Sequence, residues 1–487
     1  MELLREENRE WDYETDVLVL GYGGAGACAA IAARDGGAEV IILEKAPFGG
    51  GNTACSVGNM FLPDNVAEAI AYYRALSFGT VSDQELIRTM AEAMAALPER
   101  LKEWGIDLKL RKKNTPTFPT IPGARCIDHW SAGLGESLFK SLSDLVRQRN
   151  LGILFETPAK TILKDPKTGL TRGVLAEQAG KSLFLKARRA VVLATGGYEN
   201  NFERQGYFHF PGLKLYPFGT PYNTGDGLKM ASELGADQWH FASTEWLGPA
   251  LKEPTEKIGV AIAFRRSSGS FLFVNRSGKN FINESMNFTH RKEALAFTRF
   301  DHERAEYPNI PFYAVFDDQF RKEGPLYGLQ NSKVGYASWQ NLDEWSQDNT
   351  AEIEKGWISK AESIRALAGK LNLDPDGLQE TIDQYNRDSK EGRINAFGRS
   401  PNRMAPIEEA PFYGVELCLS IINTQGGPRH NCRAQALDME GKPIPRLYKA
   451  GELGSFFGHL YQGGSNLPEA LAFGRLAGEG AAAEIPW

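Results

Sequence analysis

The hydrophobic positions near the N-terminus predict a strand, a helix and a second strand, in that order. Residues 15–20 (TDVLVL) form a short run of apolar and β-branched residues, which is typical of a buried parallel strand. A glycine cluster follows, then an alanine-rich stretch from Gly26 to Arg34 and a second apolar run from Glu39 to Leu43. This order predicts a βαβ unit.

Similar features return later in the chain. One strand-like run, Arg189 to Leu193, ends in AlaThrGlyGly, and another, Arg446 to Ala450, ends in GlyGlu. A helix of small, apolar residues is expected from Pro468 to Ala483. Features of a nucleotide-binding domain therefore occur at both ends of the chain.

The middle of the chain has a different residue pattern from its two ends. It holds charged amphipathic helices, at Ser359–Leu371 and Pro375–Glu391, and aromatic-rich loops. We therefore predict an α/β fold in which a discontinuous Rossmann-like domain, residues 1–236 and 396–487, carries an inserted α+β cap domain, residues 237–395.

The composition and net charge argue against some classes of binding partner. Lys plus Arg is 55 and Asp plus Glu is 61, and this net charge of −6 argues against nucleic acid or an anionic membrane surface. No apolar run approaches the roughly 18 residues of a membrane helix, and the polar start MELLREENREWDYE lacks signal-peptide features. The five cysteines form no CxxC pair. We expect free thiols, no metal site, no membrane insertion and a cytoplasmic location.

The glycine cluster carries the first candidate chemistry. GlyTyrGlyGlyAlaGly, residues 21–26, fits GxGxxG between a strand and a helix. Gly21 permits a tight turn, Gly23 lets the backbone approach a pyrophosphate, and Gly26 lets the helix pack closely on the strand. Glu44 ends the second strand and can accept hydrogen bonds from a ribose diol. The motif alone leaves open NAD, FAD and a βαβ unit that binds no nucleotide.

Further segments favour FAD. Residues 49–60 (GGGNTACSVGNM) suit a second stretch of phosphate and ribityl, and residues 194–197 (ATGG) form a small-residue turn that can pass under the adenosine. Residues 448–452 (YKAGE) offer an acid for ribityl hydroxyls. Residues 463–467 (GGSNL) open the last helix, whose dipole would favour negative charge on a reduced isoalloxazine.

Together these segments resemble a known family. GYGGAGACAAIAA with Glu44, GGGNTACSVGNM, VVLATGGYENN, NTGDGLKMASELGA and LYKAGELG with GGSNLPEALAFGRLAGEGAA look like the fumarate reductase and 3-ketosteroid dehydrogenase flavoproteins, in the family's order. The resemblance implies a discontinuous FAD-binding domain and a mobile cap that closes over the flavin. No histidine stands where succinate dehydrogenases attach FAD, so we expect non-covalent FAD. The expected cofactor-binding residues are Gly21, Gly23, Gly24, Ala25, Gly26, Glu44, Lys45, Gly51, Asn52, Thr53, Ser56, Gly58, Ala159, Thr195, Gly196, Gly197, Asn223, Asp226, Gly451, Glu452, Gly464, Ser465, Asn466 and Leu467.

The substrate positions differ from those of the family's fumarate reductases. In the segment VNRSGKNFINESMNF, Phe288 falls where those enzymes carry the proton-donating arginine. Asn423 replaces a histidine, and Tyr461 replaces an arginine. Because an unpartnered buried carboxylate is costly, fumarate and succinate are poor candidates for the substrate.

The ketosteroid dehydrogenases, by resemblance, carry a tyrosine at the position of Tyr461 and a glycine at that of Ser465, whose backbone N–H helps to polarise the substrate carbonyl. Serine keeps an N–H, so this role can survive. Phe288 replaces their tyrosine, so the second proton-exchanging residue is open, with His290 the next candidate. We take Tyr461, His290 and Ser465 as candidate catalytic residues, and Phe288, Asn423 and Tyr461 as lining the substrate pocket.

Three functions remain. The first is an FAD-dependent oxidoreductase that dehydrogenates, or reduces a C=C bond in, an uncharged and cyclic carbonyl compound, by hydride transfer to or from flavin N5, with an external electron acceptor or donor. The second is a fumarate-reductase-like reductase of an unsaturated carboxylic acid, fed by an external donor. The third is a flavin-binding redox sensor or subunit, although a sensor has no need of a cap domain.

Overall fold

The computed structural model describes residues 10–245, 248–252, 261–265, 269–285, 295–342 and 344–487. The chain divides into two compact units. Unit 1 comprises residues 1–212, 219–245 and 423–487, and unit 2 comprises residues 213–218 and 246–422. Within the described residues, no helix is both long and apolar enough to cross a membrane.

Unit 1 is built on an eight-stranded sheet with the order β21-β22-β9-β1-β2-β6, in which β8 pairs with β9 and β7 with β8. Strands β1, β2, β6, β9 and β22 run parallel, with Val17 opposite Val40 and Leu20 opposite Leu193. The predicted strand at residues 15–20 lies inside β1, whose last six residues are buried, as expected of a strand covered on both faces. The elements of unit 1 are β1 (Tyr13–Leu20), α1 (Gly24–Asp35), β2 (Val40–Leu43), α2 (Gly51–Cys55), β3 (Asn59–Pro63), α3 (Val66–Ser77), α4 (Gln84–Glu103), β4 (Lys109–Lys112), β5 (Ile127–Ser131), α5 (Gly135–Gln148), β6 (Gly152–Leu154), β7 (Ala159–Lys164), β8 (Thr171–Gln178), β9 (Lys181–Leu193), α6 (Phe202–Phe208), α7 (Asp226–Glu233), β11 (Gln238–Trp239), β12 (Thr244–Glu245), β19 (Asn423–Thr424), β20 (Gly427–Pro428), β21 (Gln435–Leu437), β22 (Pro443–Lys449) and α14 (Asn466–Ala483).

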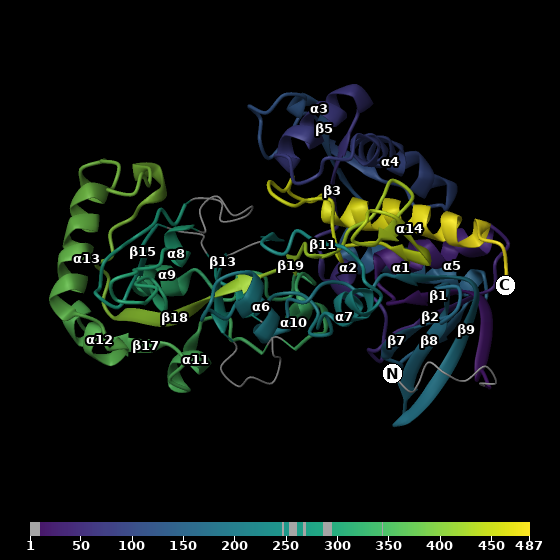
Figure 1. The fold of residues 1–487 in the computed structure, drawn as a ribbon. Helices are drawn as coiled ribbons and strands as arrows, with labels where there is room; N and C mark the ends of the chain where they lie inside the picture. The colour runs from purple at the N-terminus through teal and green to yellow at the C-terminus, as the bar shows by residue number, and fades with distance from the viewer. Residues whose placement is uncertain (1–9, 246–247, 253–260, 266–268, 286–294, 343) are drawn as a thin grey trace. The chain divides into compact units, whose positions relative to one another are not determined.

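Two helices from opposite ends of the chain lie side by side in unit 1. Helices α1 and α14 run next to each other beside the sheet (Figure 1). A Cβ added at Gly474 would lie 2.5 Å from the Ala25 carbonyl oxygen, and one at Gly478 would lie 2.2 Å from that of Ala29. The small residues of the last helix therefore allow the two backbones to approach closely, which places the middle of α14 beside the first half of α1.

Unit 2 contains a seven-stranded sheet with the order β14-β13-β18-β16-β15, and β10 and β17 also pair with β18. Its core packs α12 and α13 against the sheet through residues such as Leu272, Leu367 and Ile382. The elements of unit 2 are β10 (Tyr216–Pro217), β13 (Gly248–Lys252), β14 (Ala261–Ala263), β15 (Phe271–Val274), α8 (Leu295–Thr298), β16 (Phe312–Phe316), α9 (Asp318–Lys322), α10 (Tyr336–Trp339), α11 (Thr350–Glu354), β17 (Ser359–Ala361), α12 (Ile364–Leu371), α13 (Pro375–Lys390) and β18 (Phe412–Ile421).

The units follow the predicted order but have other boundaries. Residues 237–245 cluster with unit 1, because β11 and β12 pair with β20 and β19. Residues 396–422 cluster with unit 2, because β18 lies at the centre of its sheet. Short bridging strands and a long central strand are tertiary features that periodicity alone does not place.

Candidate active site

The first glycine turn joins β1 to α1. Gly21 has a φ of 103°, and an added Cβ would lie 2.3 Å from the Ala194 carbonyl oxygen. A Cβ at Gly26 would lie 2.0 Å from the carbonyl oxygen of Gly21. At Gly23, by contrast, the nearest atom to an added Cβ is the Gly50 carbonyl oxygen, at 3.7 Å. Gly21 and Gly26 are required by the protein's own packing, whereas Gly23 borders open space at the N-terminus of a 12-residue helix, which suits an approaching phosphate.

A second loop closes against this turn. The Gly50 N–H donates to the Tyr22 carbonyl at 2.8 Å, and the Gly24 N–H donates to Thr53 Oγ1 at 3.0 Å. Ser56 Oγ accepts the Gly58 N–H at 3.2 Å and donates to the Thr53 carbonyl at 2.8 Å. The predicted loop after β2 is therefore held at the helix N-terminus by hydrogen bonds from its own small polar residues.

The acid at the end of β2 is fixed by backbone N–H groups. Glu44 accepts from the N–H of Tyr22 and from that of Ala46, both at 2.8 Å. Burial raises the pKa of Glu44, and these hydrogen bonds oppose the shift. Lys45, in contrast, directs its ammonium to Asp226 and Thr224 at the start of α7.

A pair of carboxyl groups joins three of the predicted cofactor segments. Asn223 Nδ2 donates to Glu199 and to Glu452, at 2.7 Å in each case, and Asn52 Nδ2 donates to the same two residues at 2.8 and 3.2 Å. The Gly197 N–H also donates to Glu452, at 2.9 Å. Burial raises the pKa of Glu199 to about 7 and that of Glu452 well above its usual value, and the charge of Glu199 raises that of Glu452 further.

Two acids this close favour a state in which one of them keeps its proton, so the network presents both a donor and acceptors. Sequence reasoning found Asn52, Asn223 and Glu452 but not Glu199. Its only signal was an acid two residues after the AlaThrGlyGly turn.

The start of α14 holds the candidate catalytic tyrosine. The N–H groups of Ser465 and Asn466 both donate to the Tyr461 hydroxyl oxygen, at 3.0 Å. The ring is 6% exposed and meets Phe457 edge to face at a centroid distance of 5.2 Å. The Ser465 N–H, assigned by resemblance to the substrate carbonyl, is therefore engaged with Tyr461 in this structure.

Side-chain amides tie this helix start to the neighbouring short strands. Gln425 and Asn466 exchange two amide hydrogen bonds, at 3.0 and 2.9 Å. Behind them, Glu469 accepts from Ser455 Oγ at 2.7 Å and from the Phe456 N–H at 2.8 Å. Burial lowers the pKa of Lys449 to about 8, and the charge of Glu469 opposes this shift.

The described histidines near this site are held in packing roles. His240 stacks on Trp239 at a centroid distance of 4.1 Å, and burial lowers its pKa to about 4. His430 is fully buried, and burial lowers its pKa well below the usual value. The ring of the exposed His459 lies against Phe78, at a centroid distance of 5.1 Å. His240 and His430 are therefore neutral at neutral pH and supply no cation for a carboxylate.

Unsatisfied polar atoms support a ligand at the predicted positions. The buried side-chain atoms of the described residues that have no hydrogen-bond partner include Thr195 Oγ1, Ser465 Oγ and Asn423 Nδ2. Buried polar groups are normally satisfied, so such atoms suit contacts to a bound molecule. They occur at a predicted cofactor turn, at the start of the helix that is predicted to face the flavin and at a predicted substrate position, which fits FAD and an adjacent substrate.

The remaining predicted residues are placed as follows. All the expected cofactor residues belong to unit 1, and hydrogen bonds join the segments that contain Gly24, Lys45, Asn52, Gly197 and Glu452. Ala159 begins β7 and is half-buried. Phe288 and His290 lie outside the described residues, so the structure places neither of them. No group of three or more potential metal ligands occurs in the described part of the chain.

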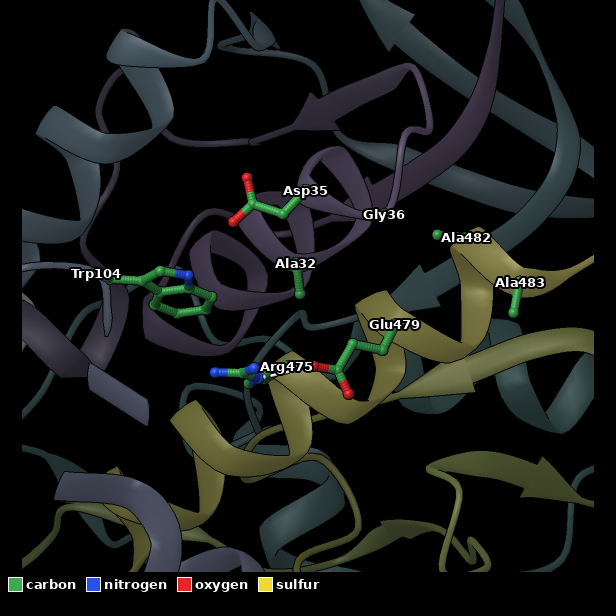
Figure 2. Close-up of a pocket in the computed structure, with 8 residues that line it drawn as sticks. All are labelled: Ala32, Asp35, Gly36, Trp104, Arg475, Glu479, Ala482 and Ala483. Carbon is green, nitrogen blue, oxygen red and sulfur yellow. Dashed lines mark hydrogen bonds and ion pairs between the residues drawn. The ribbon is translucent and has the colours of Figure 1, made fainter. Parts of the chain in front are cut away.

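A separate hollow of about 380 Å³ lies at the other end of α1, between Trp104 and the C-terminal half of α14 (Figure 2). Arg475 crosses it and pairs with Glu479 at 2.7 Å and with Glu103 at 3.0 Å. Because α1 separates this hollow from the glycine turn, it is not the cofactor site.

Comparison with known proteins identifies the class. The model of the FAD binding domain family matches residues 16–467, and the chain belongs to this family. It is an FAD-dependent oxidoreductase of the group that contains fumarate reductases and 3-oxosteroid 1-dehydrogenases, as the resemblance implied.

Its similar curated proteins act on different molecules. The vinyl phenol reductase of Lactiplantibacillus plantarum is 27% identical over 93% of this chain and 92% of its own length. A cytochrome-type fumarate reductase of Shewanella frigidimarina is 29% identical over 96% of this chain and 77% of its own. The 3-oxosteroid 1-dehydrogenase of Mycolicibacterium smegmatis is 25% identical over 95% and 96%.

Solved structures share the fold. The 3-ketosteroid Δ1-dehydrogenase of Sterolibacterium denitrificans superposes with a TM-score of 0.81 at 21% identity, covering 97% of this chain and all of that one. The open form of a flavocytochrome c3 fumarate reductase gives a TM-score of 0.73 at 25% identity, covering 97% of this chain and 78% of that one. These matches confirm the predicted α/β architecture with a Rossmann-like sheet and an additional domain.

Proposed function

We propose that this enzyme dehydrogenates, or reduces a C=C bond in, an uncharged cyclic carbonyl compound, with an external electron acceptor or donor. The observation that carries the proposal is the neutral character of the described substrate positions. Asn423 and Tyr461 stand where the fumarate enzymes, by resemblance, carry cations. Asn423 Nδ2 is buried and has no partner among the described residues, so it can donate to a neutral carbonyl oxygen.

Electrostatics supports the same substrate class. Burial raises the pKa of Tyr461 well above its usual value, and the charge of Glu245 raises it further. A site that suppresses one buried negative charge in this way would also penalise a substrate carboxylate that brings no cation with it. A neutral phenol is a good hydrogen-bond donor to a developing enolate.

We assign the following roles in this reaction to the cofactor and to residues of the chain. Bound FAD accepts or supplies the hydride at N5. Thr195 and the turn at Gly23 would face the cofactor, and the dipole of α14 would favour charge on the reduced ring. Tyr461 would exchange a proton with the substrate at its hydroxyl oxygen, while the amide of Asn423 orients the carbonyl.

Two alternatives make different demands. A fumarate-like reductase needs cations at the substrate. Arg265, one candidate for such a cation, pairs with Glu323 at 3.2 Å and lies over the ring of Phe320. A redox sensor needs no substrate donors, whereas the unpartnered amide of Asn423 suits one. The names of two similar proteins, vinyl phenol reductase and 3-oxosteroid 1-dehydrogenase, also indicate uncharged substrates for those enzymes.

Fumarate turnover tests the charge argument. With reduced methyl viologen as the electron donor, the purified enzyme should reduce fumarate at no more than about 1% of its rate with an uncharged enone, because removing one partner from a buried ion pair costs about 3–5 kcal/mol. The assay follows viologen oxidation under anaerobic conditions at equal substrate concentrations. Fumarate turnover as fast as enone turnover would contradict the proposal and would indicate cations supplied by other parts of the chain.

A further inference from the structure

Proton exchange at the Tyr461 hydroxyl requires a group that takes up and returns the proton. A phenol oxygen can accept hydrogen bonds and donate one. The N–H groups of Ser465 and Asn466 already donate to this oxygen from the start of the 18-residue helix α14. They would stabilise negative charge on it, but they cannot receive its proton. A tyrosine that gives up and regains a proton in each turnover therefore needs a basic group nearby.

Glu245 lies on the strand that supports this site. In the antiparallel pair of β12 and β19, Thr244 is opposite Thr424 and Glu245 is opposite Asn423. Glu245 is only 4% exposed. Burying a carboxyl group costs free energy. A buried carboxyl group opposite a predicted substrate position is therefore typical of a functional site.

Hydrogen bonds connect this strand pair to the tyrosine. The Gln425 N–H donates to the Ser243 carbonyl at 3.0 Å, next to the start of β12. The Gln425 side chain holds Asn466 through two amide hydrogen bonds, and the Asn466 N–H donates to Tyr461. Glu245 and Tyr461 therefore belong to one framework within unit 1.

Two buried acids, Glu245 and Glu469, raise the pKa of Tyr461 to different degrees. After burial, the negative charge of Glu245 is the largest influence that raises the pKa of Tyr461, and Glu469 contributes less. Glu469 is held by Ser455, by the Phe456 N–H and by the charge of Lys449. Glu245 is thus the acid on the packed elements whose charge the phenol senses most strongly.

We propose that Glu245 is a positioning residue that orients the Tyr461 hydroxyl and exchanges the proton that Tyr461 passes to or takes from the substrate. In C=C reduction, the Tyr461 O–H bond breaks as the substrate gains the proton, and the carboxyl group of Glu245 then returns a proton to the phenolate oxygen. Water reprotonates the Glu245 carboxylate. In dehydrogenation the same proton moves in the opposite direction. The inference rests on the proposed function only in giving Tyr461 a proton to exchange.

The first test measures the tyrosine itself and needs no substrate. In the FAD-loaded enzyme, Tyr461 is replaced by 3-fluorotyrosine, and its fluorine NMR signal is titrated with pH. In the Glu245→Gln variant the ionisation midpoint should fall, because a neighbouring negative charge has been removed. A matched variant at an exposed acid, Glu440→Gln, should leave the midpoint unchanged. Equal midpoints in the parent and Glu245→Gln would overturn the proposal, whatever the substrate proves to be.

The second test is kinetic. With cyclohex-2-en-1-one as the probe and reduced methyl viologen as the electron donor, the steady-state rate of enone reduction should slow by about 10²-fold in Glu245→Gln, the scale of one lost acid–base group. The enone concentration that gives half the maximal rate should change little.

Glu245→Asp should regain part of the rate, and Glu245→Gln should add little to the defect of a Tyr461→Phe background. The proposed proton exchange would be contradicted if Glu245→Gln alone kept the parent's rate. It would also be contradicted if the rate losses of Glu245→Gln and Tyr461→Phe multiplied in the double variant. If the parent enzyme fails to oxidise its flavin with the enone while the fluorine titration shifts as expected, the proposed substrate class is wrong but the pairing of Glu245 with Tyr461 stands.

Discussion

Gly23→Val is expected to yield a folded protein that carries almost no flavin. The backbone of Gly23 is not strained, and a Cβ there would meet no protein atom closer than 3.7 Å. The chain therefore tolerates a side chain at this position, whereas a branched one fills the space in which the pyrophosphate must approach the helix N-terminus. Loss of this contact should remove nearly all bound FAD without unfolding the domain.

The measurement is the flavin-to-protein absorbance ratio after gel filtration, with circular dichroism to verify folding. Gly206→Val is the matched control, because an added Cβ there meets nothing within 4 Å and the residue lies in α6, outside the glycine turn. Acid precipitation of the parent enzyme should leave FAD in the supernatant, since no attachment histidine is present. Normal flavin content in the Gly23 variant, or flavin that stays in the pellet, would contradict the assigned cofactor site or its non-covalent character.

Tyr461→Phe should slow the hydride-transfer half-reaction by about 10²-fold or more, the usual scale for losing one positioned acid–base or oxyanion donor. The ring keeps its contact with Phe457, so folding and FAD content should survive. The change removes the oxygen that accepts the N–H groups of Ser465 and Asn466. The defect should appear in the chemical step and not mainly in substrate binding.

Anaerobic stopped-flow spectroscopy of the flavin, with cyclohex-2-en-1-one at saturating concentration, measures this step directly. Tyr448→Phe provides a control, because that hydroxyl donates to Glu484 at 2.9 Å in another part of unit 1. A Tyr461→Phe enzyme that reoxidises its flavin at nearly the parent rate would reduce Tyr461 to a packing role. His290 would then be the next residue to test.

Local patterns were enough to predict the first strand, glycine turn and helix of unit 1. The strand at residues 15–20, the turn at Gly21–Gly26 and the acid Glu44 follow one another within 30 residues, and close sequence neighbours determine their geometry. The helix of small, apolar residues expected at 468–483 lies within α14, where Gly474 and Gly478 pack closely on α1. These features are local or depend on residue size alone.

Other features of the candidate site depend on contacts between residues that are distant in the sequence. Asn52 and Asn223 each donate to both Glu199 and Glu452. No spacing in the sequence predicts that these two acids share donors. Glu245 is placed opposite Asn423 only by a two-residue strand pair, which is too short to produce a periodic pattern. The sequence also does not predict the hydrogen bond from the Ser465 N–H to Tyr461, since any residue other than proline supplies an N–H at that position.

One measurement tests the central claim most directly. The FAD-loaded enzyme is reduced anaerobically and mixed, in separate experiments, with cyclohex-2-en-1-one and with cyclohex-1-ene-1-carboxylate, which share a ring and an activated C=C bond but differ in charge. We expect the enone to reoxidise the flavin at least about 10²-fold faster than the acid, since the site offers neutral donors and a buried carboxylate without a partner costs several kcal/mol. Rapid reoxidation by the acid with no response to the enone would contradict the account.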